Sequence, residues 1–130
     1  PALKKTGQAV VINTTVPPHF LRGQMWWVSH MQAAKAAVTT MSQSMAKEWA
    51  EYGIRCCNVA PGAIADTPAA LKQGNRAALT SEAELSPDGI PVARHVPLGR
   101  MGTSFECAMA VVFICVSEYI TAETITVDGG

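Results

Sequence analysis

The chain has 130 residues, which suits a single domain, and 48% of them are hydrophobic, an ordinary share for a globular core. Its basic and acidic residues, 10 of each, give a formal net charge of zero, which argues against an electrostatic grip on nucleic acid or anionic lipid. No apolar stretch approaches the ~20 residues of a membrane span. The first residues lack the basic end and apolar run of a signal peptide. We therefore expect neither a membrane span nor a signal peptide.

The first half of the chain predicts a strand, a loop and a long helix. Residues 8–13, QAVVIN, form a short β-branched run that is typical of a buried strand. A helical pattern extends over residues 29–52, where Ser29 can cap the start and Gly53 can take the left-handed stop. Apolar residues recur at spacings of three and four and predict one apolar stripe along this helix, namely Met31, Ala34, Val38, Met41, Met45 and Trp49.

The next segment predicts a second strand and a long loop. Residues 54–60 have the apolar pattern of a strand, which ends at a Pro-Gly pair. The following loop is polar and broken by prolines, with a short helix expected near residues 69–72. A loop of this length in a small domain is usually a lid or a binding loop, so we expect a substrate-loop segment at about residues 67–95.

The last segment predicts a helix and a strand. Thr103 and Glu106 have the T-x-x-E spacing of a capping box, and the helix that they open should continue to about Ser117. Residues 124–130, TITVDGG, predict the final strand with its turn.

The four cysteines fit this order of elements. Cys56 and Cys57 are neighbours in a predicted strand, so their side chains should face opposite sides, whereas Cys107 and Cys115 fall in a predicted helix. The chain has neither a C-x-x-C pair nor zinc-finger spacing. This pattern predicts reduced, partly buried thiols in an intracellular protein, and no metal site.

Buried strands that alternate with helices indicate a parallel sheet with crossover connections. Three strands make a narrow sheet with exposed edges. The predicted fold class is therefore α/β, a Rossmann-type doubly wound parallel sheet, of which only the C-terminal half is present in this chain.

Several ordered blocks carry a family resemblance. The segments GQAVVINTT, SHMQAAKAAVTTM, NVAPG, PLGRMG and TVDGG together resemble the C-terminal half of a short-chain dehydrogenase/reductase, over nearly the whole chain. Within that family, RGQ, AKAAV and AKEWAEYGIR are most similar to peroxisomal-type 2,4-dienoyl-CoA reductases. The resemblance implies NADPH (NADP) as cofactor, an acyl-CoA substrate from fatty acid metabolism, and a peroxisome-like organelle, although no targeting signal is visible.

The chain departs from the family pattern at two places. No glycine-rich turn for the cofactor pyrophosphate is found in it. The family's usual pair is Tyr-x-x-x-Lys, and here Met31 stands at the tyrosine position before Lys35. Methionine cannot donate a proton. By resemblance, Lys35 holds the nicotinamide ribose, and the alternative is a lysine that lays its stem over apolar surface.

The sequence therefore leaves more than one candidate for the proton donor. His30, Thr15, His19 or a bound water are the candidates, because imidazole is the common proton-transfer group near neutral pH and Thr15 is the nearest substitute for the serine that the family places after the first strand. The alternatives are a histidine bonded to a backbone carbonyl and a threonine that only finishes the strand.

Cofactor and substrate contacts follow from the resemblance. The segment Pro61, Gly62, Ile64 and Thr67 should hold the nicotinamide carboxamide and the phosphate side of the cofactor, with Gly62 permitting close approach. Lys72 should face the CoA phosphates. The alternatives are an ordinary strand-end turn and a solvated lysine.

The resemblance also implies a homo-oligomer. In the family, the helix at about 29–52 packs against its copy in another subunit, and the outer face expected here carries four polar residues, Thr39, Thr40, Gln43 and Lys47.

Three functions remain in competition. The first is NADP-dependent reduction of 2,4-dienoyl-CoA thioesters. The second is another short-chain carbonyl reductase or dehydrogenase, which would need a well-placed acid. The third is a catalytically silent family member that acts as a subunit or scaffold.

Overall fold

A computed structural model describes residues 2–18, 29–68 and 92–130. Over these residues the elements follow the order α1 (Ala2–Thr6), β1 (Ala9–Thr14), α2 (Ser29–Glu48), η2 (Ala50–Tyr52), β2 (Ile54–Pro61), α4 (Val92–His95), α5 (Ser104–Val116) and β3 (Thr124–Val127). The three strands and two long helices that the sequence predicts are all present. The sequence did not predict α1 and α4, which are short, and the helix expected near 69–72 lies outside the described residues.

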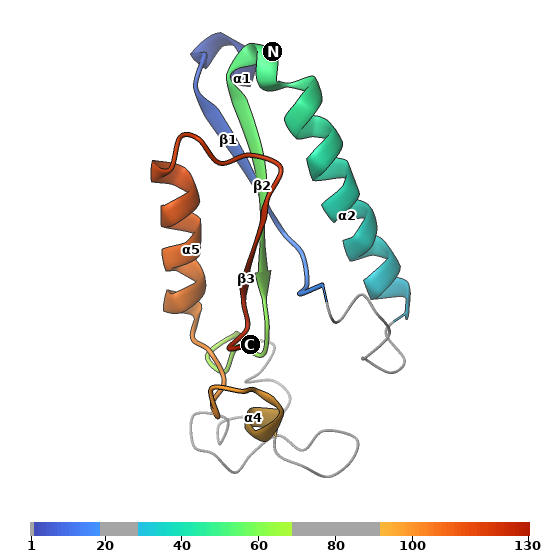
Figure 1. The fold of residues 1–130 in the computed structure, drawn as a ribbon, viewed down its shortest axis with the longest axis vertical. Helices are drawn as coiled ribbons and strands as arrows, with labels where there is room; N and C mark the ends of the chain where they lie inside the picture. The colour runs from blue at the N-terminus through green and yellow to red at the C-terminus, as the bar shows by residue number, and fades with distance from the viewer. Residues whose placement is uncertain (1, 19–28, 69–91) are drawn as a thin grey trace.

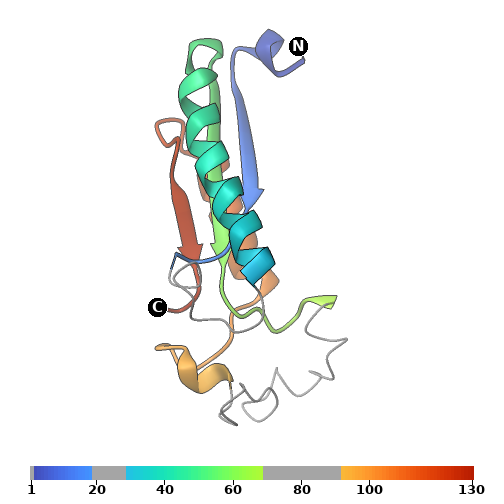
Figure 2. The same ribbon diagram turned by 90° about the vertical axis from the view of Figure 1, so that its right-hand side faces the viewer.

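The sheet is parallel and has the order β1-β2-β3. Figure 1 shows α2 and α5 on opposite faces of this sheet, and Figure 2 shows β2 between the two other strands. Parallel strands need crossover connections, and the two long helices in these connections cover the two faces of the sheet. The chain thus forms one half of a Rossmann-type doubly wound fold, as the sequence predicted.

The core has two layers, one on each face of β2. Cys56 packs with Ala46 and Ile54 beneath α2, while Cys57 packs with Val59 and Ile114 beneath α5. The opposite orientation of the two cysteines is therefore confirmed. Burial raises the pKa of both thiols, which keeps them protonated and unreactive.

The apolar stripe expected on α2 is only partly correct. Ala34 and Met41 are exposed, Met41 by 49%, whereas Ser42 and Ala46 are the buried residues of the helix. The helix is turned so that polar side chains face the sheet, because they find hydrogen-bond partners there. Thr39, expected on the outer face, lies on this inner face and bonds to Thr15.

The remaining three residues of that outer face, Thr40, Gln43 and Lys47, are exposed as expected. The α-helix ends at Glu48, and one 3₁₀ turn, η2, completes the segment to Tyr52. Gly53 has a φ of 66°, the left-handed stop that the sequence predicted.

The capping box at the start of α5 is confirmed. Thr103 Oγ1 accepts from Glu106 N, and the Glu106 carboxylate accepts from Thr103 N at 2.8 Å. At the other end of the helix, the Arg55 guanidinium donates to the carbonyls of Cys115 and Ile120. The cation therefore sits at the negative end of the helix dipole.

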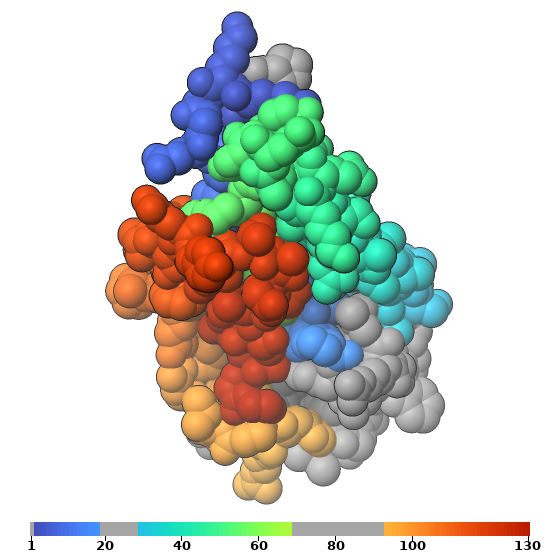
Figure 3. Space-filling view, turned by 45° about the horizontal axis from the view of Figure 1, so that its top comes forward, coloured from blue at the N-terminus to red at the C-terminus, as the bar shows by residue number. Residues whose placement is uncertain are grey.

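One face of α5 leaves apolar side chains in solvent. The exposed residues recur with helical spacing, namely Phe105, Met109, Val112 and Val116. Figure 3 shows β3 at the surface between α5 and α2, as expected for the edge strand of a narrow sheet. Among the described helices, none combines the length and the apolar character of a membrane span.

Candidate functional site

The candidate site lies at the carboxyl ends of β1 and β2. In open parallel sheets this edge is where ligands bind. Thr14 ends β1 and Pro61 ends β2, and the backbone N–H of Thr15 continues the pairing by donating to Val59 O at 2.9 Å. The sequence-predicted residues Lys35, Thr15, Pro61 and Gly62 all come from segments that reach this edge.

Lys35 is anchored to the end of β1. Its Nζ donates to Thr14 O at 2.7 Å, and the residue is half-buried on α2. This contact places an ammonium group at the carboxyl edge of the sheet. A fixed cation with donors to spare can bind the hydroxyls of a ribose, so the geometry suits the role that the sequence predicts for Lys35.

Thr15 faces the helix and not the solvent. It is 2% exposed, and its Oγ1 lies 2.8 Å from Thr39 Oγ1 and 3.2 Å from Lys35 O. Thr39 Oγ1 also donates to Lys35 O at 3.0 Å. The hydroxyl pair thus fastens the turn of α2 that carries Lys35 to β1. The proton-donor assignment of Thr15 stays a prediction, and its burial weighs against it.

The residues before Lys35 differ in exposure. Met31 is half-buried one turn earlier on α2, and its thioether has no acidic proton. His30 is exposed at the start of the helix, so water can reach its imidazole. His19 and Lys72 lie outside the described residues, and their predicted roles stay predictions.

Neither tyrosine lies near the site. Tyr52 precedes β2 and Tyr119 precedes β3, so both are at the amino edge of the sheet. The Lys4 ammonium lies 3.4 Å from the centre of the Tyr52 ring, a cation–π contact, and Tyr119 is fully exposed. A tyrosine from the described residues therefore cannot replace the one that Met31 displaces.

Gly62 is required by strand packing. Its N–H donates to Val127 O at 2.9 Å, and a Cβ at this position would lie only 2.6 Å from the Cβ of Asp128. The family resemblance predicted that this glycine permits close approach of a cofactor. The close approach that the structure contains is to β3, and the cofactor role stays a prediction.

The segment after Gly62 is tied to the start of α5. Ile64 forms a parallel bridge with Gly102, and Ala65 N donates to Gly102 O at 3.0 Å. Thr67 Oγ1 lies 3.4 Å from Ile64 O, within its own turn. The predicted cofactor segment is therefore held against the loop that leads into α5.

Asp66 strengthens this attachment, a role that the sequence did not predict. Its carboxylate accepts from Ser104 N and Ser104 Oγ, both at 2.7 Å. The hydrogen bonds from Ser104 lower the pKa of Asp66. A carboxylate at the N-terminus of a helix also interacts favourably with its dipole. No local sequence pattern joins residues so far apart, so only the fold reveals this pair.

An ion pair lies beside this attachment. The Arg100 guanidinium donates to both oxygens of Glu106, at 3.0 and 2.5 Å. Hydrogen bonding to Arg100, aided by the Thr103 N–H, lowers the pKa of Glu106 to about 2. The pair is largely exposed, so it contributes little to stability beyond the capping box that Glu106 also serves.

Buried side chains form a second group that the sequence did not predict. Asn13 Nδ2 donates to Ser42 Oγ at 2.9 Å, Ser42 Oγ lies 2.7 Å from Asn58 Oδ1, and Asn58 Nδ2 donates to Thr124 Oγ1 at 3.1 Å. This polar chain links β1, α2, β2 and β3. Its only sequence signal was an asparagine inside each of two mostly apolar strands.

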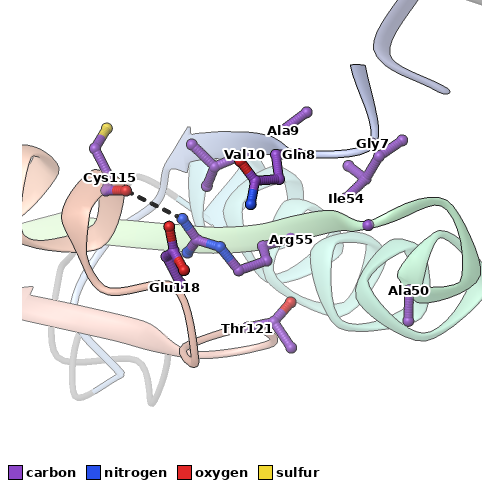
Figure 4. Close-up of a pocket in the computed structure, with 11 residues that line it drawn as sticks. Gly7, Gln8, Ala9, Val10, Ala50, Ile54, Arg55, Cys115, Glu118 and Thr121 are labelled. Atoms are coloured by element: carbon purple, nitrogen blue, oxygen red, sulfur yellow. Dashed lines mark hydrogen bonds between the residues drawn. The ribbon is translucent and has the colours of Figure 1, made fainter. Parts of the chain in front are cut away.

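The described residues also line two pockets. One of about 460 Å³ opens at the carboxyl edge, between the end of β3 and the residues Leu98, Arg100 and Glu106. The other, of about 470 Å³, is shown in Figure 4 and lies at the amino edge around Arg55. The amino-edge pocket is remote from Lys35, and its arginine is already engaged by the end of α5.

Comparisons with known proteins agree with this fold. The family model described as Enoyl-(Acyl carrier protein) reductase matches residues 1–130. The chain is 32% identical to a peroxisomal 2,4-dienoyl-CoA reductase of Arabidopsis thaliana over 130 residues, and this match covers 96% of the chain and 39% of the relative. It is 37% identical to a 3-oxoacyl-[acyl-carrier-protein] reductase of Vibrio harveyi, and this match covers 98% of the chain and 46% of the relative.

A solved structure, acetoin dehydrogenase YohF from Salmonella typhimurium, superposes on the chain with a TM-score of 0.71 at 27% identity. The superposition covers 98% of this chain and 45% of the dehydrogenase chain. The chain thus spans less than half the length of the proteins that it matches.

Proposed function

Because the chain belongs to the short-chain dehydrogenase/reductase family, we propose that the complete protein is an NADPH-dependent reductase of 2,4-dienoyl-CoA thioesters. The family is one of oxidoreductases that use nicotinamide cofactors. The specific cofactor, the substrate and the activity of the complete protein are parts of the proposal.

The observation that carries the proposal is Met31 one helical turn before Lys35. Reduction of a ketone delivers a proton to oxygen and needs a positioned acid, which typically contributes ~10²–10⁴-fold. Methionine cannot serve as that acid. Reduction of a dienoyl thioester delivers its proton to the carbon next to the thioester carbonyl, so a tyrosine at this position is not required.

Each residue has a defined part in this proposal. NADPH supplies a hydride to the polyenoyl chain. Lys35, held at 2.7 Å from Thr14 O, binds the ribose of the nicotinamide nucleotide, and the turn from Pro61 to Thr67 binds the carboxamide and phosphate side. His30, exposed at the start of α2, would hold the water that protonates the carbon, and the hydroxide left behind would take its proton from the solvent that reaches this side chain. Lys72 binds the CoA phosphates.

The name of the Arabidopsis relative states that it produces a (3E)-enoyl-CoA. We propose the same product here, because addition of a hydride at the far end of the diene and of a proton next to the thioester leaves one double bond between them. A peroxisome-like compartment and a homo-oligomer formed through the exposed face of α2 belong to the same proposal.

The decisive experiment is steady-state NADPH oxidation by the full-length protein with a 2,4-dienoyl-CoA, across pH. We expect turnover in wild type, a loss of about 10²-fold in His30→Ala, and a smaller loss in Thr15→Ala. Met31→Tyr should not be needed for activity. Recovery of turnover only in Met31→Tyr would favour the silent-subunit function. Wild-type rates in both alanine variants would exclude His30 and Thr15 and leave His19 or a donor outside this chain.

A second candidate function has its own support. The Vibrio harveyi relative and the Salmonella structure are named for reactions at carbonyl or hydroxyl groups. A 3-oxoacyl thioester and acetoin therefore belong in the same assay. A higher kcat/KM with either of them than with the dienoyl-CoA would replace the proposed substrate class.

A further inference from the structure

The inner face of α2 is docked on the sheet by hydrogen bonds as well as by the apolar packing around Ala46. Ser42 is at its centre, fully buried, and it contacts Asn13 of β1 and Asn58 of β2. Asn58 is also fully buried and extends the chain to Thr124 of β3. One serine hydroxyl thus connects the helix to all three strands.

Such a group is costly in a small core unless each polar atom is paired. Here Asn13 Nδ2 donates to the Ser42 hydroxyl, whose single proton is shared between two acceptors, Asn58 Oδ1 at 2.7 Å and Val38 O at 2.9 Å. Hydrogen bonds are directional, whereas the small side chain of Ala46 on the same face leaves the rotation of the helix loosely determined. The polar chain therefore fixes how α2 is turned about its axis, together with the Thr15–Thr39 hydroxyl pair one turn earlier.

The rotation of α2 decides where Lys35 points. Lys35 precedes Ser42 by two helical turns, so both lie on the same face. The amine reaches Thr14 O, the carbonyl next to Asn13 in β1. Asn13 bonds to Ser42, so adjacent residues of one strand hold both ends of this stretch of helix.

We propose that Ser42 is a positioning residue for the Lys35 ammonium. Asn58, which is itself hydrogen-bonded to Thr124, holds Ser42 in place. Ser42 contacts neither cofactor nor substrate and acts through the orientation of α2. Its effect on cofactor binding rests on the proposed function, whereas its effect on the position of the Lys35 amine does not.

The first arm of the test needs no cofactor. In the full-length protein, trace labelling with an amine-acylating reagent gives the rate at Lys35 relative to Lys47, an exposed lysine of the same helix. We expect Ser42→Ala to raise this ratio about threefold or more, in keeping with the loss of one hydrogen bond. Ser44→Ala changes an exposed serine of the same helix, so it is the matched control and should leave the ratio unchanged.

A second variant covers the case in which Ser42→Ala does not fold. Thr124→Val removes the last acceptor of the chain with almost no change of shape, and Thr126→Val, exposed on the same strand, is its control. Thr124→Val should change the Lys35 ratio in the same direction, and Thr124→Ser should restore it. A general loss of stability would not be expected to act on one lysine and spare the other.

The second arm measures the affinity for NADPH by titration of its fluorescence. Ser42→Ala and Thr124→Val should weaken binding by about fivefold, with their controls unchanged. If the wild-type protein does not bind NADPH, the proposed function is contradicted. The labelling ratios of Lys35 and Lys47 then decide the inference about Ser42 by themselves. Labelling ratios in Ser42→Ala and Thr124→Val that equal those of their controls would overturn the inference, whatever the cofactor result.

Discussion

Gly62→Ala should destabilise the protein before any cofactor is bound. An alanine Cβ would lie 2.6 Å from Asp128 Cβ and 2.7 Å from Asp128 Cα, whereas ordinary contact begins at 3.4 Å. The ends of β2 and β3 would have to separate by most of an ångström. That movement would strain the hydrogen bond of 2.9 Å from Gly62 N to Val127 O.

The magnitude follows from two terms. Overpacking of a close contact costs about 1–3 kcal/mol, and a weakened backbone hydrogen bond adds about 1 kcal/mol. The expected loss in the free energy of unfolding is therefore roughly 2–4 kcal/mol. With an m-value of about 2 kcal/mol/M, the urea midpoint should fall by about 1–2 M.

The assay is urea unfolding of the full-length protein without nucleotide, followed by circular dichroism. Gly99→Ala is the control, because its Cβ would meet nothing within 4 Å and its cost is confined to a φ of +68°, about 1 kcal/mol. If Gly62→Ala kept the wild-type midpoint and weakened only NADPH binding, the packing explanation would be refuted and the glycine would serve the cofactor alone.

Three further predictions concern single side chains. Lys35→Ala should weaken NADPH binding in a fluorescence titration while far-UV circular dichroism stays native, since alanine is a better helix former; wild-type affinity would make Lys35 a surface lysine. Because the pKa of Glu106 is lowered from 4.5 to about 2 in the folded protein, its carboxylate stabilises the fold fully above about pH 4.5. This contribution is lost as the pH falls towards about 2. Thermal unfolding of Glu106→Gln between these pH values should therefore depend less on pH than wild type, and an identical dependence would contradict this. Asp66→Asn should speed hydrogen exchange at the amides of Ala65 and Gly102, because the two hydrogen bonds to Ser104 that hold this segment are weakened; unchanged exchange would mean that the bridge between Ile64 and Gly102 holds the segment without Asp66.

The sequence alone determined the elements and their order. Hydrophobic periodicity and turn residues are local, so the strand at 54–60, the helix after Thr103 and the stop at Gly53 could be predicted within a residue or so. The alternation of strands and helices then determined a parallel sheet. The motif blocks determined the family and pointed to Lys35, because the small alanines beside this lysine leave space around its amine.

Only the tertiary structure decided which face of α2 is buried and what holds it there. Counting apolar residues favoured Ala34 and Met41, because that method treats polar side chains as outward-facing. Ser42 and Thr39 face inward because Asn58 and Thr15, which belong to strands distant in sequence, offer them partners. The same reason applies to Asp66 and Ser104. Whether a polar group can be buried depends on a partner whose position exists only after the chain has folded.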